Sequence, residues 1–232
     1  FQPGDKNESL VDVMGQIASL TGIQLLIPEN IDHVCCGTPY SSKGYSAASQ
    51  AMAKKTIAML YESSNKGNIP IVVDTSPCTY QLTTLLPLLD DNHKELYQQL
   101  TLMDLIPFLE GIVHNNPTPQ LQRHSILHPT CSTEKMGNIE SLLALANTCA
   151  EETTLPINRG CCGFAGDRGL LVPELTASAT QFEADELVDC DPGSFAYSSS
   201  KTCEIGMQRA TGRNYESIAL LVRDYLSQDK VN

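Results

Sequence analysis

The sequence predicts an α/β protein made of two pseudo-repeated βαβ-type units, with short parallel sheets and with cysteine loops at the carboxyl ends of the strands. Short β-branched runs alternate with longer amphipathic segments, which is typical of βαβ units. Two Cys-Cys-Gly motifs begin at Cys35 and Cys161. The second cysteine of each motif is followed by another cysteine 42 and 41 positions later, at Cys78 and Cys203. Such a matched spacing indicates a duplicated unit.

The composition narrows the function classes. With 41% apolar and 18% charged residues, the 232-residue chain is not mainly disordered. Its net charge of −12 disfavours binding to nucleic acid or to an anionic lipid surface. We expect no transmembrane segment, because no stretch approaches the roughly 20 apolar residues that a bilayer requires. A chain of this length needs no disulfide framework, so its nine cysteines favour metal or redox chemistry.

The first unit is predicted to cover residues 1–87. Residues 9–21 form a helical stripe of apolar side chains that a glycine follows, and residues 23–27 are expected to form a buried strand. After the first Cys-Cys-Gly motif, apolar residues near a 3.6-residue spacing predict a second helix. The strand expected at residues 69–73 then runs into the loop before Cys78.

The second unit, residues 124–232, repeats this order. The expected elements are strands at residues 126–128 and 195–199 and helices at residues 139–150 and 173–188. Residues 88–123 contain three prolines and are predicted to form a helical excursion and linker between the units.

The first unit lacks a counterpart of the strand and cysteine with which the second unit begins. We expect both to lie upstream of Phe1, so that the first unit is truncated at its N-terminus. Asp5 is the alternative, because it precedes Cys35 by 30 positions, as Cys131 precedes Cys161.

The cysteine loops are expected to converge, since ligands bind where the carboxyl ends of parallel strands meet. Helix N-termini at this edge favour thiolates. The second unit offers the four thiols that a [4Fe–4S] cluster requires. These candidate ligands are Cys131, Cys161, Cys162 and Cys203. Zinc remains the alternative, although the short C-x2–4-C pairs of typical zinc sites are absent.

The first unit supplies fewer thiols. Cys35, Cys36 and Cys78 are candidate metal ligands but fall one short of four. Cys149 and Cys190 lie outside the repeated pattern, and we expect them to be ordinary buried thiols.

Five other residues near the cysteine loops are candidates for contacts with a cluster. Gly163 would let backbone N–H groups approach sulfur. Lys43, Arg168 and Lys201 would offset the charge of an anionic cluster, or else pair with surface carboxylates. His128 would donate a hydrogen bond to a cluster sulfur, or else cap the end of a strand.

These motifs resemble a known family. The repeated order of cysteine, Cys-Cys-Gly and cysteine resembles the cysteine-rich CCG domain of the heterodisulfide reductase B subunit, the glycolate oxidase iron–sulfur subunit and the anaerobic glycerol-3-phosphate dehydrogenase C subunit. The runs over residues 160–179 and 198–212, with the loops that end at Cys78 and Cys131, are similar to the C-terminal region of bacterial FAD-linked, iron–sulfur-containing D-lactate dehydrogenases.

The resemblance implies an iron–sulfur electron-transfer module of a FAD-linked D-lactate or related 2-hydroxy-acid dehydrogenase. Its implied cofactor is a [4Fe–4S] cluster, which an isolated fragment can lose, whereas FAD is expected only in an N-terminal part outside this chain. The implied partners are the FAD-binding and ferredoxin-like domains of the parent protein and a quinone or cytochrome acceptor. The chain alone is not expected to oxidise lactate. The expected location is the cytoplasm, at the periphery of the inner membrane in the full-length enzyme.

The sequence also departs from the heterodisulfide reductase pattern, in which each repeat ends in C-x-x-C. Gln81 and Gly206 occupy the third positions after Cys78 and Cys203, which disfavours a five-thiolate cluster. Two other function classes remain open. One is a zinc-stabilised or cluster-free docking module for a flavoprotein partner. The other is a thiol-disulfide redox module in which an adjacent cysteine pair acts directly.

Overall fold

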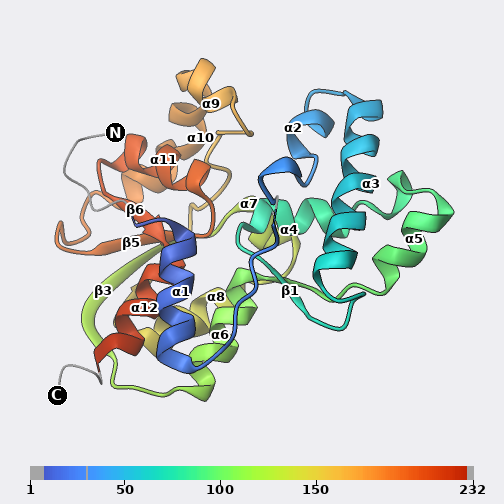
Figure 1. Ribbon diagram of the computed structural model, residues 1–232. Helices are drawn as coiled ribbons and strands as arrows, with labels where there is room; N and C mark the ends of the chain where they lie inside the picture. Colours follow the sequence, from blue (N-terminus) through green and yellow to red (C-terminus); the bar gives the residue numbers. More distant parts are fainter. Residues whose placement is uncertain (1–7, 30, 229–232) are drawn as a thin grey trace.

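The computed structural model describes residues 8–29 and 31–228, in which helices surround two parallel sheets (Figure 1). This arrangement confirms the predicted α/β class. The smaller sheet pairs β1 (Ile71–Val73) with β2 (Leu102–Asp104). The larger sheet has the strand order β4-β3-β5-β6. Its strands are β3 (Leu121–His128), β4 (Ala150–Thr154), β5 (Phe195–Ser198) and β6 (Tyr215–Ser217).

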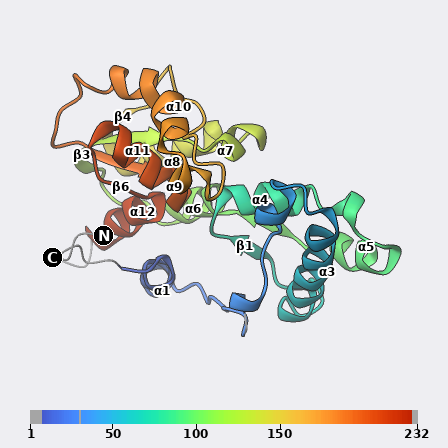
Figure 2. The same ribbon diagram turned by 90° about the horizontal axis from the view of Figure 1, so that it is seen from above.

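Helices cover both faces of the larger sheet (Figure 2), because its central strands carry apolar side chains on both sides. Leu127 and Tyr197 face one layer of helices, whereas Ile126 and Ala196 face the other, as expected from the alternation of side chains along a strand. The first layer contains α1 (Leu10–Thr21), α6 (Leu105–Asn115), α8 (Ile139–Cys149) and α12 (Ile218–Ser227). The second layer contains α10 (Pro173–Glu186) and α11 (Lys201–Thr211).

Helix α1 confirms the helix predicted near the start of the first unit. The Ser9 side chain accepts a hydrogen bond from the Asp12 N–H, and the Asp12 carboxylate accepts one from the Ser9 N–H, which together form a capping box. Gly22 ends the helix with a φ of +77°, a conformation that glycine adopts without strain. Val13 and Ile17 are buried in the core that α1 shares with α12.

Whereas α1 itself packs in the core of the larger sheet, a smaller core lies in the part of the first unit that follows α1. Helix α3 (Ser46–Ser63), the second predicted helix, buries Ala53, Ile57 and Leu60 in this core, which also includes side chains of α4 (Ser76–Thr83). The other short helices of this part are η1 (Ile31–His33), α2 (Thr38–Ser41), η2 (Leu86–Leu88) and α5 (Asp91–Gln98). The segment expected as a helical excursion and linker also contributes β2 to the small sheet and α6 to the core of the larger sheet.

Most of the predicted elements are present. The strands expected at residues 69–73, 126–128 and 195–199 correspond to β1, β3 and β5. The helices expected at residues 139–150 and 173–188 correspond to α8 and α10.

The prediction of a strand at residues 23–27 is wrong. This apolar run has no regular secondary structure and pairs with no strand in the part of the chain that the structure describes, and Leu26 and Ile27 are more than half exposed. At the corresponding point of the second unit, before the Cys-Cys-Gly motif, β4 pairs with β3. An apolar run becomes a strand only when a neighbour takes its backbone hydrogen bonds. Asp5 lies outside the described residues.

A chain of buried hydrogen bonds joins the two units. Ser76 Oγ at the start of α4 lies 3.2 Å from Asp104 Oδ1 and 2.8 Å from Ser199 Oγ. Because the carboxylate only accepts, Ser76 donates to Asp104 and accepts from Ser199. Asp104 also accepts from Thr79 Oγ1 at 2.8 Å and from the Ile106 N–H at 3.1 Å. Asp104 therefore anchors the start of α4 and of α6 at one point.

We expect Asp104→Ala to lower the free energy of unfolding by about 3 kcal/mol, because it leaves buried hydroxyl and N–H donors without their acceptor. Urea unfolding measures this loss. The exposed Asp189→Ala is the matched control and should change stability by less than about 0.5 kcal/mol. Equal effects of the two substitutions would contradict the anchoring role.

Candidate metal centre

The carboxyl ends of β3 and β5 bring the cysteines of the second unit to one edge of the sheet. β3 ends at His128, and Cys131 is the first residue of α7 (Cys131–Lys135). β5 ends at Ser198, and Cys203 lies in the first turn of α11. The second Cys-Cys-Gly motif is in the loop between β4 and the short helix α9 (Arg168–Leu171).

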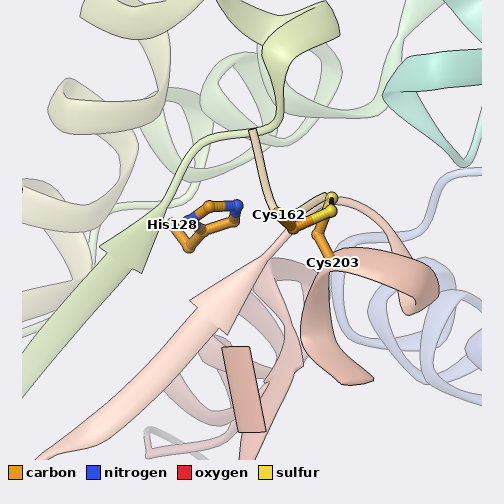
Figure 3. A group of neighbouring side chains, drawn as sticks. All are labelled: His128, Cys162 and Cys203. Atoms are coloured by element: carbon orange, nitrogen blue, oxygen red, sulfur yellow. Dashed lines mark hydrogen bonds between the residues drawn. The ribbon is translucent and has the colours of Figure 1, made fainter. Parts of the chain in front are cut away.

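The four thiols predicted to converge in the second unit lie together. Cys162 Sγ is 3.0 Å from Cys203 Sγ, and Figure 3 shows the two sulfur atoms side by side. The Cys161 thiol interacts with both Cys131 and Cys162. Cys162 and Cys203 are buried, Cys131 is half-buried and Cys161 is exposed. The group thus extends from the core to the surface.

These contacts divide the thiols into two that ionise readily and two that do not. Hydrogen bonds from Cys131 and Cys162 lower the pKa of Cys161 to about 2. The hydrogen bond with Cys162 lowers the pKa of Cys203 to about 6, against the opposing effect of burial. The same hydrogen bonds raise the pKa of Cys131 and Cys162. Thiolates are the form that binds metals, and the lowered pKa values of Cys161 and Cys203 favour that form.

The first unit repeats this arrangement with three thiols. Cys36 Sγ lies 3.1 Å from Cys78 Sγ, and this contact lowers the pKa of Cys36 to about 6. Cys35 interacts with Cys36, and the Gly37 N–H points to the Cys35 sulfur at 3.5 Å. Among the described residues, we find no fourth thiol at this site.

A buried histidine and glutamate lie beside the thiols of the second unit. His128 Nδ1 is 2.9 Å and 3.0 Å from the two carboxylate oxygens of Glu183, and both residues are almost inaccessible to solvent. One ring nitrogen of His128 and the sulfurs of Cys162 and Cys203 all lie within 4.8 Å of one another. Burial lowers the pKa of His128. Interactions with Cys203 and Glu183 outweigh this effect and raise the pKa to about 9. The sequence pattern gave no indication of Glu183, although it lies on the same face of α10 as the buried Thr176 and Thr180.

Two of the three basic residues near the loops, Lys43 and Lys201, form ion pairs with carboxylates. Lys43 Nζ is 2.7 Å from Asp167, which links the first unit to the loop after the second Cys-Cys-Gly motif. Lys201 Nζ is 2.9 Å from Glu204. Arg168 is exposed at the start of α9. Cys149 is buried in α8 and Cys190 packs against another core, so neither joins the thiol groups.

Two glycines allow close packing around the Cys-Cys-Gly loop. Gly163 has a φ of +69°, and a Cβ there would lie 2.6 Å from the Leu175 carbonyl oxygen. The Gly163 N–H points to the Cys161 sulfur at 3.4 Å. A Cβ at Gly206 would lie 3.3 Å from the Cβ of Cys162, so the third position after Cys203 faces this group without supplying a ligand.

This donor set fits a thiolate-bound metal centre. The four thiols form a continuous run of contacts from Cys131 through Cys161 and Cys162 to Cys203, and a ring nitrogen of His128 lies within 4.8 Å of the Cys162 and Cys203 sulfurs. Soft sulfur donors of this kind select iron–sulfur clusters or zinc rather than magnesium or calcium.

In comparisons with known proteins, residues 4–83 match the model of the CCG family, which is described as a cysteine-rich domain. The match covers the first unit, and the second CCG motif has the same local arrangement of thiols.

The chain is also similar to several curated proteins. It is 29% identical over 154 residues to the C subunit of the anaerobic glycerol-3-phosphate dehydrogenase of Escherichia coli K12, a match that covers 64% of the chain and only 37% of that relative. It is 26% identical over 174 residues to the uncharacterized protein YkgE of the same strain, covering 68% of each. It is 25% identical over 195 residues to the lactate utilization protein A of Macrococcus caseolyticus, covering 78% of the chain and 76% of that protein. No solved structure matches the chain. No helix in the described ranges is long and apolar enough to cross a membrane.

We expect Gly163→Ala to lower the free energy of unfolding by about 3 kcal/mol, since the added methyl group meets backbone of α10 in a left-handed conformation. Gly166→Ala is the matched control, because Gly166 has a similar φ of +77° but no atom within 4 Å of the added Cβ. It should cost only about 1 kcal/mol. Thermal unfolding that ranks the two variants equally would show that the loop is not packed against α10.

Proposed function

We propose that this chain is an iron–sulfur electron-transfer module and that Cys131, Cys161, Cys162 and Cys203 bind a [4Fe–4S] cluster. The observation that carries the proposal is the meeting of these four thiols, which come from three separate segments of the chain. Such a cluster takes four thiolate ligands and carries one electron at a time when bound.

The arrangement of the residues suits electron transfer. Cys162 and Cys203 are buried, so they hold one side of the centre away from water. Cys161 is exposed, so the opposite side is accessible to a redox partner. The buried hydrogen bonds around Ser76 and Asp104 keep the adjoining helix ends in place. Little movement of the protein is therefore needed when an electron arrives or leaves.

The type of enzyme to which the chain belongs is inferred from its distant relatives and from the resemblance of its longer motifs to iron–sulfur-containing D-lactate dehydrogenases. We propose that the chain belongs to a FAD-linked D-lactate or related 2-hydroxy-acid dehydrogenase and passes electrons from flavin toward a quinone or cytochrome. Its direct partners would be the FAD-binding and ferredoxin-like domains of that enzyme. Similarity to a protein named as part of glycerol-3-phosphate dehydrogenase and to a protein named for lactate utilization supports this class of enzyme.

The three thiols of the first unit, Cys35, Cys36 and Cys78, supply three of the four ligands that a second centre needs. Metal binding there would require a fourth donor.

We expect anaerobic reconstitution with iron and sulfide to give a brown protein with about four iron atoms per chain at the second unit. Cys203→Ser should lose this iron, because it removes a buried ligand. Cys149→Ser is the matched control: it also alters a buried cysteine on a helix, but one outside the thiol group, and it should retain the iron. Iron content and visible absorbance measure the outcome.

Two results would contradict the proposal. Zinc bound in place of iron would favour the docking module. A colourless, metal-free protein in which Cys162 and Cys203 form a disulfide would favour thiol-disulfide chemistry.

A further inference from the structure

We propose that His128 binds the metal of this centre directly through Nε2, beside Cys162 and Cys203, and that Glu183 is the positioning residue that orients it. The inference rests on the proposed function only in requiring a metal at these thiols, and it does not require that metal to be iron. It adds a nitrogen donor to a site that the sequence predicts from cysteines alone.

The position of His128 places a nitrogen donor at the thiols. It is the last residue of β3, and its side chain is fully buried. Figure 3 shows a ring nitrogen of His128 facing the sulfur atoms of Cys162 and Cys203. The three potential ligand atoms lie within 4.8 Å of one another, which a single metal centre can bridge after a small adjustment of the side chains.

Glu183 fixes which nitrogen of the ring is available. Both of its oxygens lie within 3.0 Å of His128 Nδ1, and an ionised carboxylate only accepts hydrogen bonds. Nδ1 therefore carries a hydrogen, so Nε2 is the nitrogen that can bind a metal once it has lost its own proton. A carboxylate that holds the far nitrogen in this way is the usual support of a metal-binding histidine.

His128 Nε2 is buried and makes no hydrogen bond of ordinary geometry among the described residues, although the Cys203 sulfur is near enough to raise the pKa of the ring. Unpaired buried polar atoms are rare and unfavourable, and a metal ion or a proton shared with sulfur would satisfy this one. His124, on the same strand, shows the contrast. Its Nε2 lies 2.7 Å from Thr154 Oγ1 and its Nδ1 2.9 Å from Ser194 Oγ, so both nitrogens have partners.

Because the four thiolates remain ligands in the proposed centre, His128 would be an additional donor, and a neutral imidazole would add no negative charge to it. The competing arrangement is a protonated His128 that only donates a hydrogen bond to the Cys203 sulfur.

Pulsed EPR of the reduced, iron-loaded chain with ¹⁵N-labelled histidine separates these two arrangements. We expect a strong nitrogen coupling of the size that a bond to iron produces. The coupling should vanish in His128→Gln and persist in His124→Gln, the matched control on β3. A weak nitrogen coupling typical of a hydrogen bond, or no coupling, would overturn the inference. If the chain still held about four iron atoms, the proposed function would stand. Labelled wild-type protein decides this even where His128→Gln does not fold.

The affinity for Co²⁺, measured by titration with this metal alone, tests the inference even if the chain binds no iron. His128→Gln should weaken Co²⁺ binding at least tenfold, and Glu183→Gln about tenfold, because the amide still accepts from Nδ1 but lacks the charge. His124→Gln should leave binding unchanged. Binding of Co²⁺ that depends on His128 without any iron binding would support the inference and contradict the proposed function. Equal Co²⁺ binding by His128→Gln and the wild type, or no binding at all, would overturn the inference.

Discussion

The feature on which the structure depends is the parallel alignment of β3 and β5. Because their carboxyl ends meet at one edge, the residues that follow them are brought together from positions 70 apart in the chain. Cys131 and Cys203 begin helices at this edge, and the Cys-Cys-Gly loop closes over it. The apolar layers on both faces of the sheet fix the strands, so the thiols meet without any disulfide.

The same geometry explains the difference between the two units. In the second unit β4 and β5 flank β3, whereas in the described part of the first unit β1 pairs with β2 alone and residues 23–27 stay unpaired. The first site correspondingly brings together Cys35, Cys36 and Cys78, and the second brings together four thiols and a histidine. The two-stranded sheet thus has fewer potential metal ligands at its edge than the four-stranded sheet.

Sequence patterns predicted the fold class, most of the elements and the meeting of the thiols, because alternating apolar periods and cysteine spacing follow directly from βαβ geometry. They failed at residues 23–27, where hydrophobicity could not reveal a missing partner strand. They also failed at Glu183, since a buried carboxylate has no signature apart from its position on the inner face of α10. The contact of Glu183 with His128 spans 55 positions and depends on how α10 packs on the sheet.

The central claim is that the thiols of the second unit hold iron and sulfide together. Iron X-ray absorption of the anaerobically prepared chain addresses this most directly, because it reports the atoms bound to each iron. We expect sulfur as the dominant neighbour together with a close iron–iron shell. An environment of oxygen and nitrogen alone, with no iron–iron shell, would contradict this claim.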